Sequence, residues 1–503
     1  MIGLLDMNTH DDRLLKSVAP SDWVNPTPKS RYDLVVLGGG PAGLVAAMGA
    51  AGLGARVALV EKHLLGGDCL NSGCVPSKAL LAAARRVQEV REAPEFGIKE
   101  TGPVEVDFPS VMDRMRRLRA DLSVHDSTER LRKAGVDVFL GTGRFSTPDA
   151  IQVGGLSLRF RKALIATGAR ALVPPIPGLD QTPFFTNETL FTLTELPRRL
   201  VVLGGGPIGC EMAQAFRRFG SEVTLVERAS ILPRDEPAAA DFIRRAFKQD
   251  GIQVLEATEA ISVLPGAEKL IRIKNEKGES ELKADAILVA AGRRLNLEGI
   301  GLTEAGIELA GRGLQLDPFS RTTNRRVFVA GDAAGGPQFT HTADAQARMV
   351  LRNAFFLGRG KAKDMIVPWA TYTDPEVAQV GLTKAVAEAQ GYEVETLKVD
   401  VAATDRGYLE DDQGFVQAVL KRGSDRVLGI TLVGRHAGEW AGEAALLLHL
   451  NPTLRALSET IHPYPTGAEV LKRLGDEGQR RRLTPMALKF FGLWFRLGRG
   501  GAA

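Results

Sequence analysis

A strand–turn–helix–strand pattern occurs twice in this sequence, and it constrains the fold more than any other feature. In the first copy, the hydrophobic run 32–37 leads into GGGPAG at 38–43, then into a stretch of small residues and a second hydrophobic run that ends in Glu61. The second copy has GGGPIG at 204–209 and ends in Glu227. Both copies take 23 residues from first glycine to glutamate, from 38 to 61 and from 204 to 227. This matched spacing predicts two parallel βαβ units.

Each residue type in the pattern has a physical reason to bind a dinucleotide. The first glycine permits a tight turn, the second lets the backbone approach a pyrophosphate, and the third lets the helix pack on the strand. The helix N-terminus offers N–H groups to the phosphates, and the glutamate accepts hydrogen bonds from a ribose diol. One such motif is weak evidence, whereas two in register predict two bound dinucleotides. The predicted ligands are Gly38, Gly40, Gly43 and Glu61 in the first copy and Gly204, Gly206, Gly209 and Glu227 in the second.

The glutamate of the second copy also bears on which nicotinamide nucleotide binds. A carboxylate beside the 2′-hydroxyl repels the 2′-phosphate of NADP, for which an arginine would be expected instead. Glu227 therefore favours NADH. Arg228 follows directly and partly offsets this effect, so NADPH stays open as the alternative.

Two of the three cysteines in the chain lie five residues apart, soon after the first copy. Cys69 and Cys74 belong to the run GGDCLNSGCVPSK at 66–78. Such a pair can close a disulfide ring that opens and re-forms, storing two electrons beside a bound cofactor. Half of a metal site and two buried thiols are the alternatives, but the sequence has no second CxxC or Cys/His cluster to complete a metal site. The third cysteine, Cys210, is predicted to be a small buried packing residue.

The composition excludes several classes of protein. With 503 residues, 44% hydrophobic and 25% charged, the chain has the composition of a globular enzyme of several domains. A net charge of +4 gives no indication of nucleic-acid binding. Residues 1–30 contain acids and no apolar run, so they are not a secretory signal, and no stretch approaches the ~18 apolar residues of a membrane span. The predicted compartment is therefore the cytoplasm.

Further motifs follow along the chain in a fixed order. They are LIATG at 164–168, ILVAAGRR at 287–294, VFVAGD at 327–332 and a final HPYPTGAE at 462–469. Together with the glycine motifs and the cysteine run, this order resembles the class I pyridine nucleotide–disulfide oxidoreductases. That flavoenzyme family includes dihydrolipoamide dehydrogenase, glutathione reductase and mercuric reductase, and the resemblance extends from about residue 31 to about residue 475.

The resemblance implies an α/β fold with two Rossmann-like dinucleotide-binding domains, for FAD and NAD(P), plus a C-terminal α+β dimerisation domain that forms a homodimer. Applied to this sequence, it divides the chain into five regions. These are an N-terminal arm (1–30), an FAD-binding domain (31–170 and 285–364), an NAD(P)-binding domain (171–284), a dimerisation domain (365–478) and a basic aromatic tail (479–503).

The resemblance also implies roles for individual residues. Cys69 resembles the interchange thiol that attacks the substrate, and Cys74 the charge-transfer thiol that lies against the flavin. Lys78 and Glu211 resemble a buried ion pair near flavin N5, where the alternative is a solvated surface pair worth under ~1 kcal/mol. The implied FAD ligands are Gly38, Gly40, Gly43, Glu61, Lys62, Gly67, Lys78, Gly143, Thr167, Gly168 and Asp332, and Gly292 joins the nicotinamide-nucleotide set.

The C-terminal motif departs from the disulfide reductases of this family at the substrate site. Those enzymes end in His-Pro-Thr-x-x-Glu, in which the histidine reaches the other subunit as acid and base and the glutamate orients it. Here the run IHPYPTGAE places Tyr464 at the histidine's position and Glu469 at the glutamate's, with His462 two positions earlier. A tyrosine with a pKa near ~10 is a poor base at neutral pH. Mercuric reductases carry Pro-Tyr-x-Thr-x-x-Glu at this point.

The electron acceptor is therefore predicted to be a metal ion, as in mercuric reductase, with several alternatives. The sequence has no C-terminal cysteine pair and no N-terminal CxxC domain for delivery of Hg(II), which argues against efficient mercury reduction. If the loop brings His462 to Cys69, reduction of a small disulfide or dihydrolipoamide dehydrogenase activity is restored. A redox-sensing or membrane-docking scaffold is the non-enzymatic alternative, but binding alone needs none of the thiols.

Both ends of the chain extend beyond the resemblance. Residues 1–30 are predicted to form an extended arm. The tail 479–503 is basic and aromatic and too short to span a bilayer. Peripheral membrane contact through a surface helix and packing on the dimer are the two alternatives for this tail.

Overall fold

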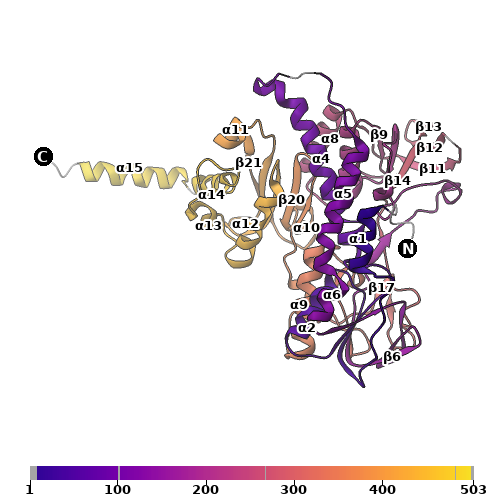
Figure 1. Ribbon diagram of the computed structural model, residues 1–503. Helices are drawn as coiled ribbons and strands as arrows, with labels where there is room; N and C mark the ends of the chain where they lie inside the picture. Colours follow the sequence, from indigo (N-terminus) through magenta and orange to yellow (C-terminus); the bar gives the residue numbers. More distant parts are fainter. Residues whose placement is uncertain (1–7, 100–101, 267, 482, 500–503) are drawn as a thin grey trace. The chain divides into compact units, whose positions relative to one another are not determined.

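The computed structural model describes residues 8–99, 102–266, 268–481 and 483–499 (Figure 1). It forms two compact units. The first comprises Met1–Ile231 and Asp250–Met365, and the second Leu232–Gln249 and Ile366–Ala503. The predicted FAD-binding and NAD(P)-binding domains lie mostly within the first unit, so the boundaries predicted between them stay predictions.

The first unit contains a seven-stranded sheet with the order β3-β2-β1-β6-β5-β4, and β18 also pairs with β6. Its parallel strands are β1 (Tyr32–Leu37), β2 (Val57–Glu61), β3 (Val136–Leu140), β6 (Leu156–Ile165) and β18 (Val327–Val329). The antiparallel strands β4 (Gly143–Thr147) and β5 (Ala150–Val153) extend one edge. Buried side chains continue along β1 and β2 because helices such as α2 (Pro41–Gly52) and α9 (Thr340–Phe355) cover the sheet.

A second parallel sheet in the same unit has the order β10-β9-β8-β14. Its strands are β8 (Arg199–Leu203), β9 (Glu222–Val226), β10 (Gln253–Leu255) and β14 (Ala286–Val289), with α7 (Pro207–Phe219) between the first two. The two predicted βαβ units are therefore confirmed. The unit also contains smaller antiparallel sheets. One consists of β11 (Glu259–Leu264), β12 (Lys269–Asn275) and β13 (Gly278–Ala284). In the two-stranded sheets, β7 (Ala169–Ala171) pairs with β15 (Arg293–Leu295), and β16 (Leu309–Ala310) pairs with β17 (Gly313–Leu314).

The cysteine run forms two consecutive helices, α3 (Gly67–Asn71) and α4 (Cys74–Glu92). Helix α4 packs against α7 and against α5 (Phe108–Leu122), while α6 (Thr128–Lys133) packs on β3. The helix that begins at Cys74 thus packs on α7, the helix of the second glycine motif.

The extended arm predicted for residues 1–30 is wrong at residues 9–18, and residues 1–7 lie outside the described part of the chain. Helix α1 (Thr9–Val18) begins after Asn8, whose side chain accepts hydrogen bonds from the backbone N–H groups of two residues in the first turn. Leu14 and Val18, four residues apart on one face, are buried, and Asp11 forms a buried ion pair with Arg119 of α5 (2.6 Å). This spacing and the N-cap favour a helix. Residues 23–28 follow without helix or strand.

The second unit is an α+β domain, as predicted for the chain after residue 365. Its antiparallel sheet has the order β19 (Trp369–Thr371), β20 (Glu376–Gly381), β23 (Val427–Gly434), β22 (Phe415–Lys421) and β21 (Val394–Asp400). Its helices are α10 (Lys384–Ala389), α11 (Asp405–Leu409), α12 (Ala437–Leu450), α13 (Leu454–Glu459), α14 (Glu469–Arg481) and α15 (Pro485–Arg499), and it also contains most of α8 (Pro237–Asp250). In the described part of the chain, no helix is long and apolar enough to cross a bilayer.

Candidate active site

The ligands predicted for the first dinucleotide converge at one edge of the large sheet. Pairing sets Leu37 opposite Val60 and Ile165, and Ile165 opposite Val329. The residues that follow these strand ends therefore meet at the carboxyl edge, where doubly wound sheets bind ligands. This edge carries Gly38, Gly40, Gly43, Glu61, Gly143, Thr167, Gly168 and Asp332.

Two glycines of the first turn are required by contacts. Gly38 has φ of 111°, and a Cβ added to it would lie 2.3 Å from the Ala166 carbonyl oxygen. A Cβ on Gly43 would lie 1.9 Å from the Gly38 carbonyl oxygen. Both distances are far below van der Waals contact, so the turn between β1 and α2 needs glycine at both places.

The polar groups at this edge fit a ligand. Glu61 is buried, and its two carboxylate oxygens accept the N–H groups of Gly39 (2.6 Å) and His63 (2.7 Å). Burial raises the pKa of Glu61, while these N–H groups oppose that shift. Thr167 Oγ1 is buried and has no hydrogen-bond partner among the described residues, so it fits the predicted role of a ligand contact. Lys62 is exposed next to Glu61.

The second turn repeats this geometry at the carboxyl edge of the smaller sheet. Gly204 has φ of 117°, with an added Cβ 2.4 Å from the Ala290 oxygen, and a Cβ on Gly209 would lie 1.9 Å from the Gly204 oxygen. Glu227 accepts hydrogen bonds from the N–H groups of Gly205 (2.7 Å) and Ala229 (2.9 Å). Gly292 follows β14 with φ of 122°, at the same edge as this turn.

The two thiols lie next to each other, and their pKa values are shifted in opposite directions. Cys74 is the first residue of α4, and its Sγ lies 3.5 Å from Thr340 Oγ1 at the start of α9. A hydrogen bond from the Cys69 thiol lowers the pKa of Cys74 to about 6. Thr340 and the Lys78 ammonium also lower this pKa, whereas burial raises it. The same hydrogen bond, together with burial, raises the pKa of Cys69. In this dithiol form, the negative charge therefore resides on Cys74.

Lys78 and Glu211 form the ion pair that the sequence predicted. Lys78 Nζ lies 2.9 and 3.1 Å from the two carboxylate oxygens of Glu211. The Glu211 side chain on α7 is only 5% exposed and that of Lys78 38%. Because α4 carries both Cys74 and Lys78, the pair joins the cysteine helix to the second nucleotide motif. The pair is therefore buried on the Glu211 side and partly exposed on the Lys78 side, and its predicted place near flavin N5 stays a prediction.

Sequence reasoning missed the group that connects the cysteine run to the sheet edge. Arg293 lies 2.8 Å from Asp68, next to Cys69, and 3.3 Å from Asp332. Asp68 also accepts hydrogen bonds from Ser72 (2.7 Å) and Asn187 (3.0 Å). Only the position of Arg293 in the AAGRR motif could have indicated a role. Thr340 had no local signal at all.

Cys210 is buried, as predicted, and its thiol donates to the Gly205 carbonyl oxygen (3.3 Å). It therefore supports the second glycine turn from inside α7.

The C-terminal motif lies in the second unit, where its three predicted residues have different surroundings. His462 is engaged at both ring nitrogens, with Nε2 2.7 Å from Glu443 and Nδ1 3.1 Å from the Thr460 oxygen. Tyr464 is 70% exposed and donates its hydroxyl to Asp405 (2.6 Å). That hydrogen bond raises the pKa of Tyr464.

Glu469, predicted to orient an acid/base residue, instead accepts a hydrogen bond from Arg473 (3.2 Å). Its other carboxylate oxygen is buried with no hydrogen-bond partner in the part of the chain that is described. The loop thus holds an exposed tyrosine that is bonded to Asp405 and a histidine whose side chain is buried and bonded to Glu443.

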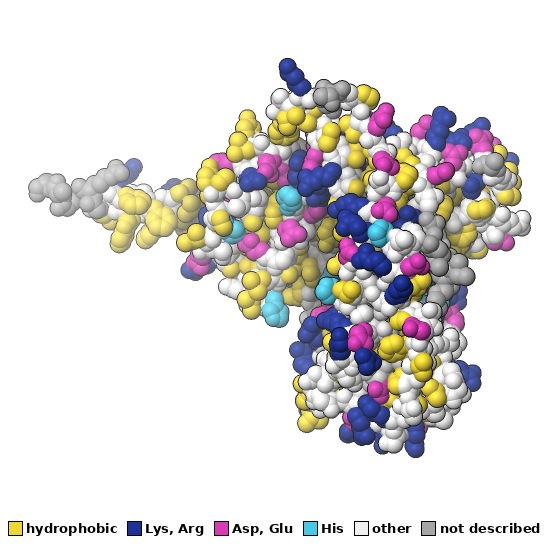
Figure 2. Space-filling model, viewed as in Figure 1, with side chains coloured by type: hydrophobic (Ala, Val, Ile, Leu, Met, Phe, Trp, Pro, Cys, Tyr) yellow, Lys and Arg dark blue, Asp and Glu magenta, His cyan; other side chains and the backbone are white. Residues whose placement is uncertain are grey.

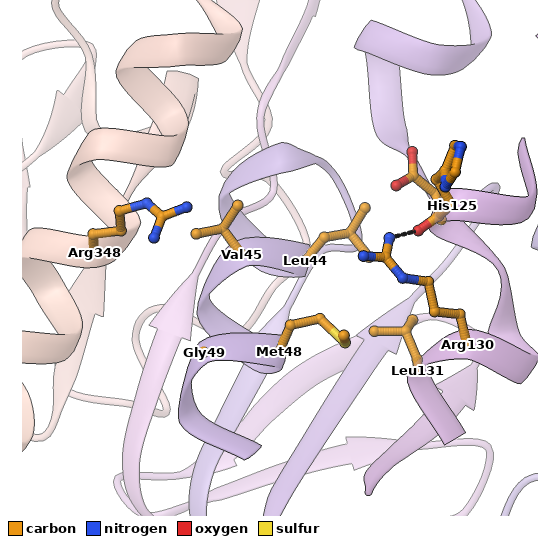
Figure 3. A pocket seen from close by; sticks show the side chains of 9 residues that line it. Leu44, Val45, Met48, Gly49, His125, Arg130, Leu131 and Arg348 are labelled. Atoms are coloured by element: carbon orange, nitrogen blue, oxygen red, sulfur yellow. Dashed lines mark hydrogen bonds between the residues drawn. The ribbon is translucent and has the colours of Figure 1, made fainter. Parts of the chain in front are cut away.

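A separate surface cavity of about 390 Å³ lies beside α2, and Figure 3 shows its lining. Leu44, Val45 and Met48 project from α2, with Leu131 of α6 beside them. Arg348 on the far side is already paired with Asp344 (2.9 Å). The cavity contains none of the predicted site residues.

Comparison with known families decides the identity of this arrangement. The sequence model of the pyridine nucleotide-disulphide oxidoreductases matches residues 32–347, and that of their dimerisation domain matches residues 367–474. The chain belongs to this family. The predicted resemblance is confirmed, and the dimerisation-domain match supports the predicted homodimer.

Individual relatives carry several activities. The chain is 32% identical to a mercuric reductase of Lysinibacillus sphaericus over 476 residues, 94% of this chain and 87% of the relative. It is 35% identical to a dihydrolipoyl dehydrogenase of Thermus scotoductus, over 88% and 97% of the two chains. Among solved structures, the Cu(II) complex of the HOCl-induced flavoprotein disulfide reductase RclA from Escherichia coli matches with a TM-score of 0.78 and 28% identity, covering 89% of this chain and 99% of that one. LpdA from Mycobacterium tuberculosis matches with a TM-score of 0.80 and 28% identity, covering 91% and 100%.

The chain is therefore an FAD-dependent NAD(P)H oxidoreductase of the disulfide type. The first glycine turn, with the unpartnered hydroxyl of Thr167, fits the dinucleotide half of FAD. The second turn fits NAD(P)H. When bound, FAD supplies the two-electron relay between the nicotinamide nucleotide and the cysteine pair.

Proposed function

We propose that this enzyme is an NADH-dependent reductase of a thiophilic metal ion, of the mercuric reductase type, that works as a homodimer. Electrons leave the Cys69–Cys74 pair for the metal ion, which the two sulfurs bind. Thiolates suit soft ions such as Hg(II) and Cu(I). The oxidation of one NADH supplies two electrons, which reduce one Hg(II) to Hg(0) or two Cu(II) to two Cu(I).

The observation that carries this proposal is that the two candidate acid/base residues of the C-terminal loop, His462 and Tyr464, already have hydrogen-bond partners in the second unit. A disulfide reductase needs a group that takes and returns a proton at the interchange thiol. His462 already has both ring nitrogens engaged, and its side chain is only 5% exposed. Tyr464 is exposed, but its bond to Asp405 raises a pKa that is ordinarily already near ~10. A protonated phenol can bond a sulfur or a metal-bound ligand, and a metal ion needs no proton transfer.

The relatives support a metal-ion acceptor. Several are named mercuric reductases, and the RclA structure is a Cu(II) complex. The sequence has three cysteines, and residues 211–503 contain none that could hand over Hg(II). Cu(II), the ion bound in the RclA structure, is therefore the favoured ion.

The test compares acceptors with the purified FAD-loaded dimer. NADH oxidation is followed with Cu(II), Hg(II), lipoamide, glutathione disulfide and a quinone. We expect turnover of a metal ion to exceed turnover of both disulfides, to be lost in Cys69→Ser, and to fall about tenfold in Tyr464→Phe, while His462→Ala stays within about twofold. Cys69→Ser also controls for direct reaction of the metal with NADH.

Reduction of a small disulfide is the second candidate, because the His462–Glu443 contact of 2.7 Å is a histidine–carboxylate pair of the kind that acts as a base. Efficient turnover of lipoamide that is abolished by His462→Ala but not by Tyr464→Phe would establish it and refute the metal-ion proposal. The cytoplasmic location predicted from the sequence stays a prediction.

A further inference from the structure

Helix α15 (Pro485–Arg499) exposes an unusual amount of apolar surface. Of its described side chains, at residues 485–497, all except Ala487 are exposed. We call its exposed apolar residues the apolar face: Met486, Leu488, Phe490, Phe491, Leu493, Trp494, Phe495 and Leu497. Trp494 is 65% exposed and its ring stacks on Phe490, with centroids 6.5 Å apart. Figure 2 shows these hydrophobic side chains along the helix.

The two charged residues of α15 whose side chains are described occupy a narrow strip. Lys489 and Arg496 are seven residues apart, nearly two helical turns, and so lie on one side with Gly492 between them. The apolar face takes up the remaining circumference. The helix is thus amphipathic, with a wide aromatic face and a narrow basic one.

The charge of this region has one sign only. The six charged residues after Gln479 are all lysine or arginine, in a chain whose total charge is only +4. Two of them, Arg480 and Arg481, are exposed at the end of α14, just before α15. A surface that binds this region must therefore offer an apolar layer to the apolar face and negative charges to the basic residues.

We propose that α15 docks the enzyme on a membrane surface that contains anionic phospholipids, lying flat in the headgroup layer. The apolar face enters the boundary of the acyl chains, and Trp494 takes the interfacial depth that suits an aromatic ring with an N–H group. Lys489 and Arg496 extend to the phosphates, as long basic side chains do at this boundary. Two copies of the helix packed on each other would bring like charges together, which argues against a second chain as the occupant. The proposal does not depend on which electron acceptor the enzyme uses.

Vesicle flotation with the full-length FAD-loaded enzyme tests the proposal. We expect at least about tenfold more bound protein on vesicles of phosphatidylcholine with phosphatidylglycerol than on phosphatidylcholine alone, and loss of much of this difference at high salt. The emission of Trp494 is expected to shift to shorter wavelength on binding. Trp494→Phe, which keeps the apolar face, should still bind without the shift.

Two full-length variants separate the parts of the surface. Phe490→Glu with Trp494→Glu should abolish binding, and Lys489→Glu with Arg496→Glu should reduce it about tenfold or more on anionic vesicles. Leu53→Glu, which changes an equally exposed leucine after α2, is the matched control and should bind normally. NADH oxidation should be unchanged in all of them.

Equal binding to both kinds of vesicle, or binding that survives the Phe490→Glu and Trp494→Glu changes, would overturn the proposal. A third result would also overturn it. If the unchanged protein binds no vesicles, and sedimentation gives a lower mass for the Phe490→Glu and Trp494→Glu double variant than for the unchanged protein, then the apolar face covers a second copy of the chain.

Discussion

The cysteine run packs on the first glycine turn, whereas no described residue packs on the equivalent glycine of the second turn. The Gly66 N–H donates to the Gly39 oxygen (2.9 Å), and a Cβ on Gly67 would lie 2.6 Å from the Cα of Gly40. A Cβ added to Gly40 itself would lie 3.7 Å from the Gly67 Cα, whereas one added to Gly206, the equivalent position in the second turn, would have no described atom within 4 Å. Two turns with the same backbone thus differ in what lies above them.

The glutamates of the two turns also differ in burial, and the one in the first turn is the more buried. Glu61 is 9% exposed and its pKa is raised by burial. Glu227 is half-buried, and the neighbouring Arg228 is exposed and lies 3.6 Å from Glu259. We interpret the closed first turn as suited to a cofactor that stays bound, and the open second turn as suited to a nucleotide that enters and leaves in each cycle.

The largest effect is expected at the cysteines beside the closed turn. Cys74→Ser should lower NADH-dependent turnover by at least roughly 10³-fold, because the pair acts as a unit. The long-wavelength thiolate-to-flavin absorption seen after two-electron reduction should vanish, while NADH binding at the open turn remains. Cys210→Ser, which changes the one remaining cysteine, is the control. Persistence of the band in Cys74→Ser would refute the role of Cys74.

Alanine at the third glycine of each turn should affect the binding of one nucleotide and leave the other unchanged. In both turns the added methyl group would lie 1.9 Å from a carbonyl oxygen, which costs about 1–3 kcal/mol of folding free energy. We expect Gly43→Ala to lower the flavin content of the purified protein. Gly209→Ala should keep its flavin and raise the KM for NADH.

Flavin absorbance per chain, thermal unfolding and steady-state kinetics measure these effects. Gly52→Ala, at the end of α2 where an added methyl group meets nothing within 4 Å, should change none of them. Loss of flavin in Gly209→Ala but not in Gly43→Ala would reverse the assignment of the two turns.

A pH titration measures the acidity of Cys74, which lies beside the first glycine turn. Because the pKa of Cys74 is lowered to about 6, its thiolate predominates above that pH and is protonated below it. The long-wavelength band of the two-electron-reduced enzyme should therefore fall as the pH is lowered through about 6. Lys78→Met removes a cation that lowers this pKa, so the midpoint should move to higher pH. A midpoint that does not move would exclude that electrostatic contribution.

The smallest effect is expected at the acid of the open turn. Glu227→Ala removes the carboxylate proposed to bind the ribose hydroxyls, and a hydrogen bond to a charged group contributes about 1.5–3 kcal/mol. We expect the KM for NADH to rise at least about tenfold and that for NADPH to rise less, since Arg228 remains. Glu222→Ala, an exposed acid at the start of the same strand, is the control. A larger loss with NADPH than with NADH would contradict the predicted preference for NADH.

Local pattern was enough to predict the parts of the site that follow directly from strand ends. The predicted strand 32–37 is β1, and both glycine turns and their glutamates lie where the spacing placed them. Helix α1 was missed although Asn8 as N-cap and the spacing of Leu14 and Val18 were local signals for a helix. Arg293 and Thr340 were missed because the residues through which they contact the cysteine run, Asp68 and Cys74, lie more than 200 residues away in sequence.

By itself, the sequence determined the two nucleotide-binding units, the adjacent thiols and the family, because each depends on residue types at fixed short spacing. Tertiary structure alone decided which thiol carries the charge, which turn is covered and which groups hold His462 and Tyr464. Those properties depend on hydrogen bonds, burial and nearby charges contributed by distant segments, such as Thr340 to Cys74 and Asp405 to Tyr464. Short spacing cannot encode these contacts, since only the packing of helices and sheets brings such segments together.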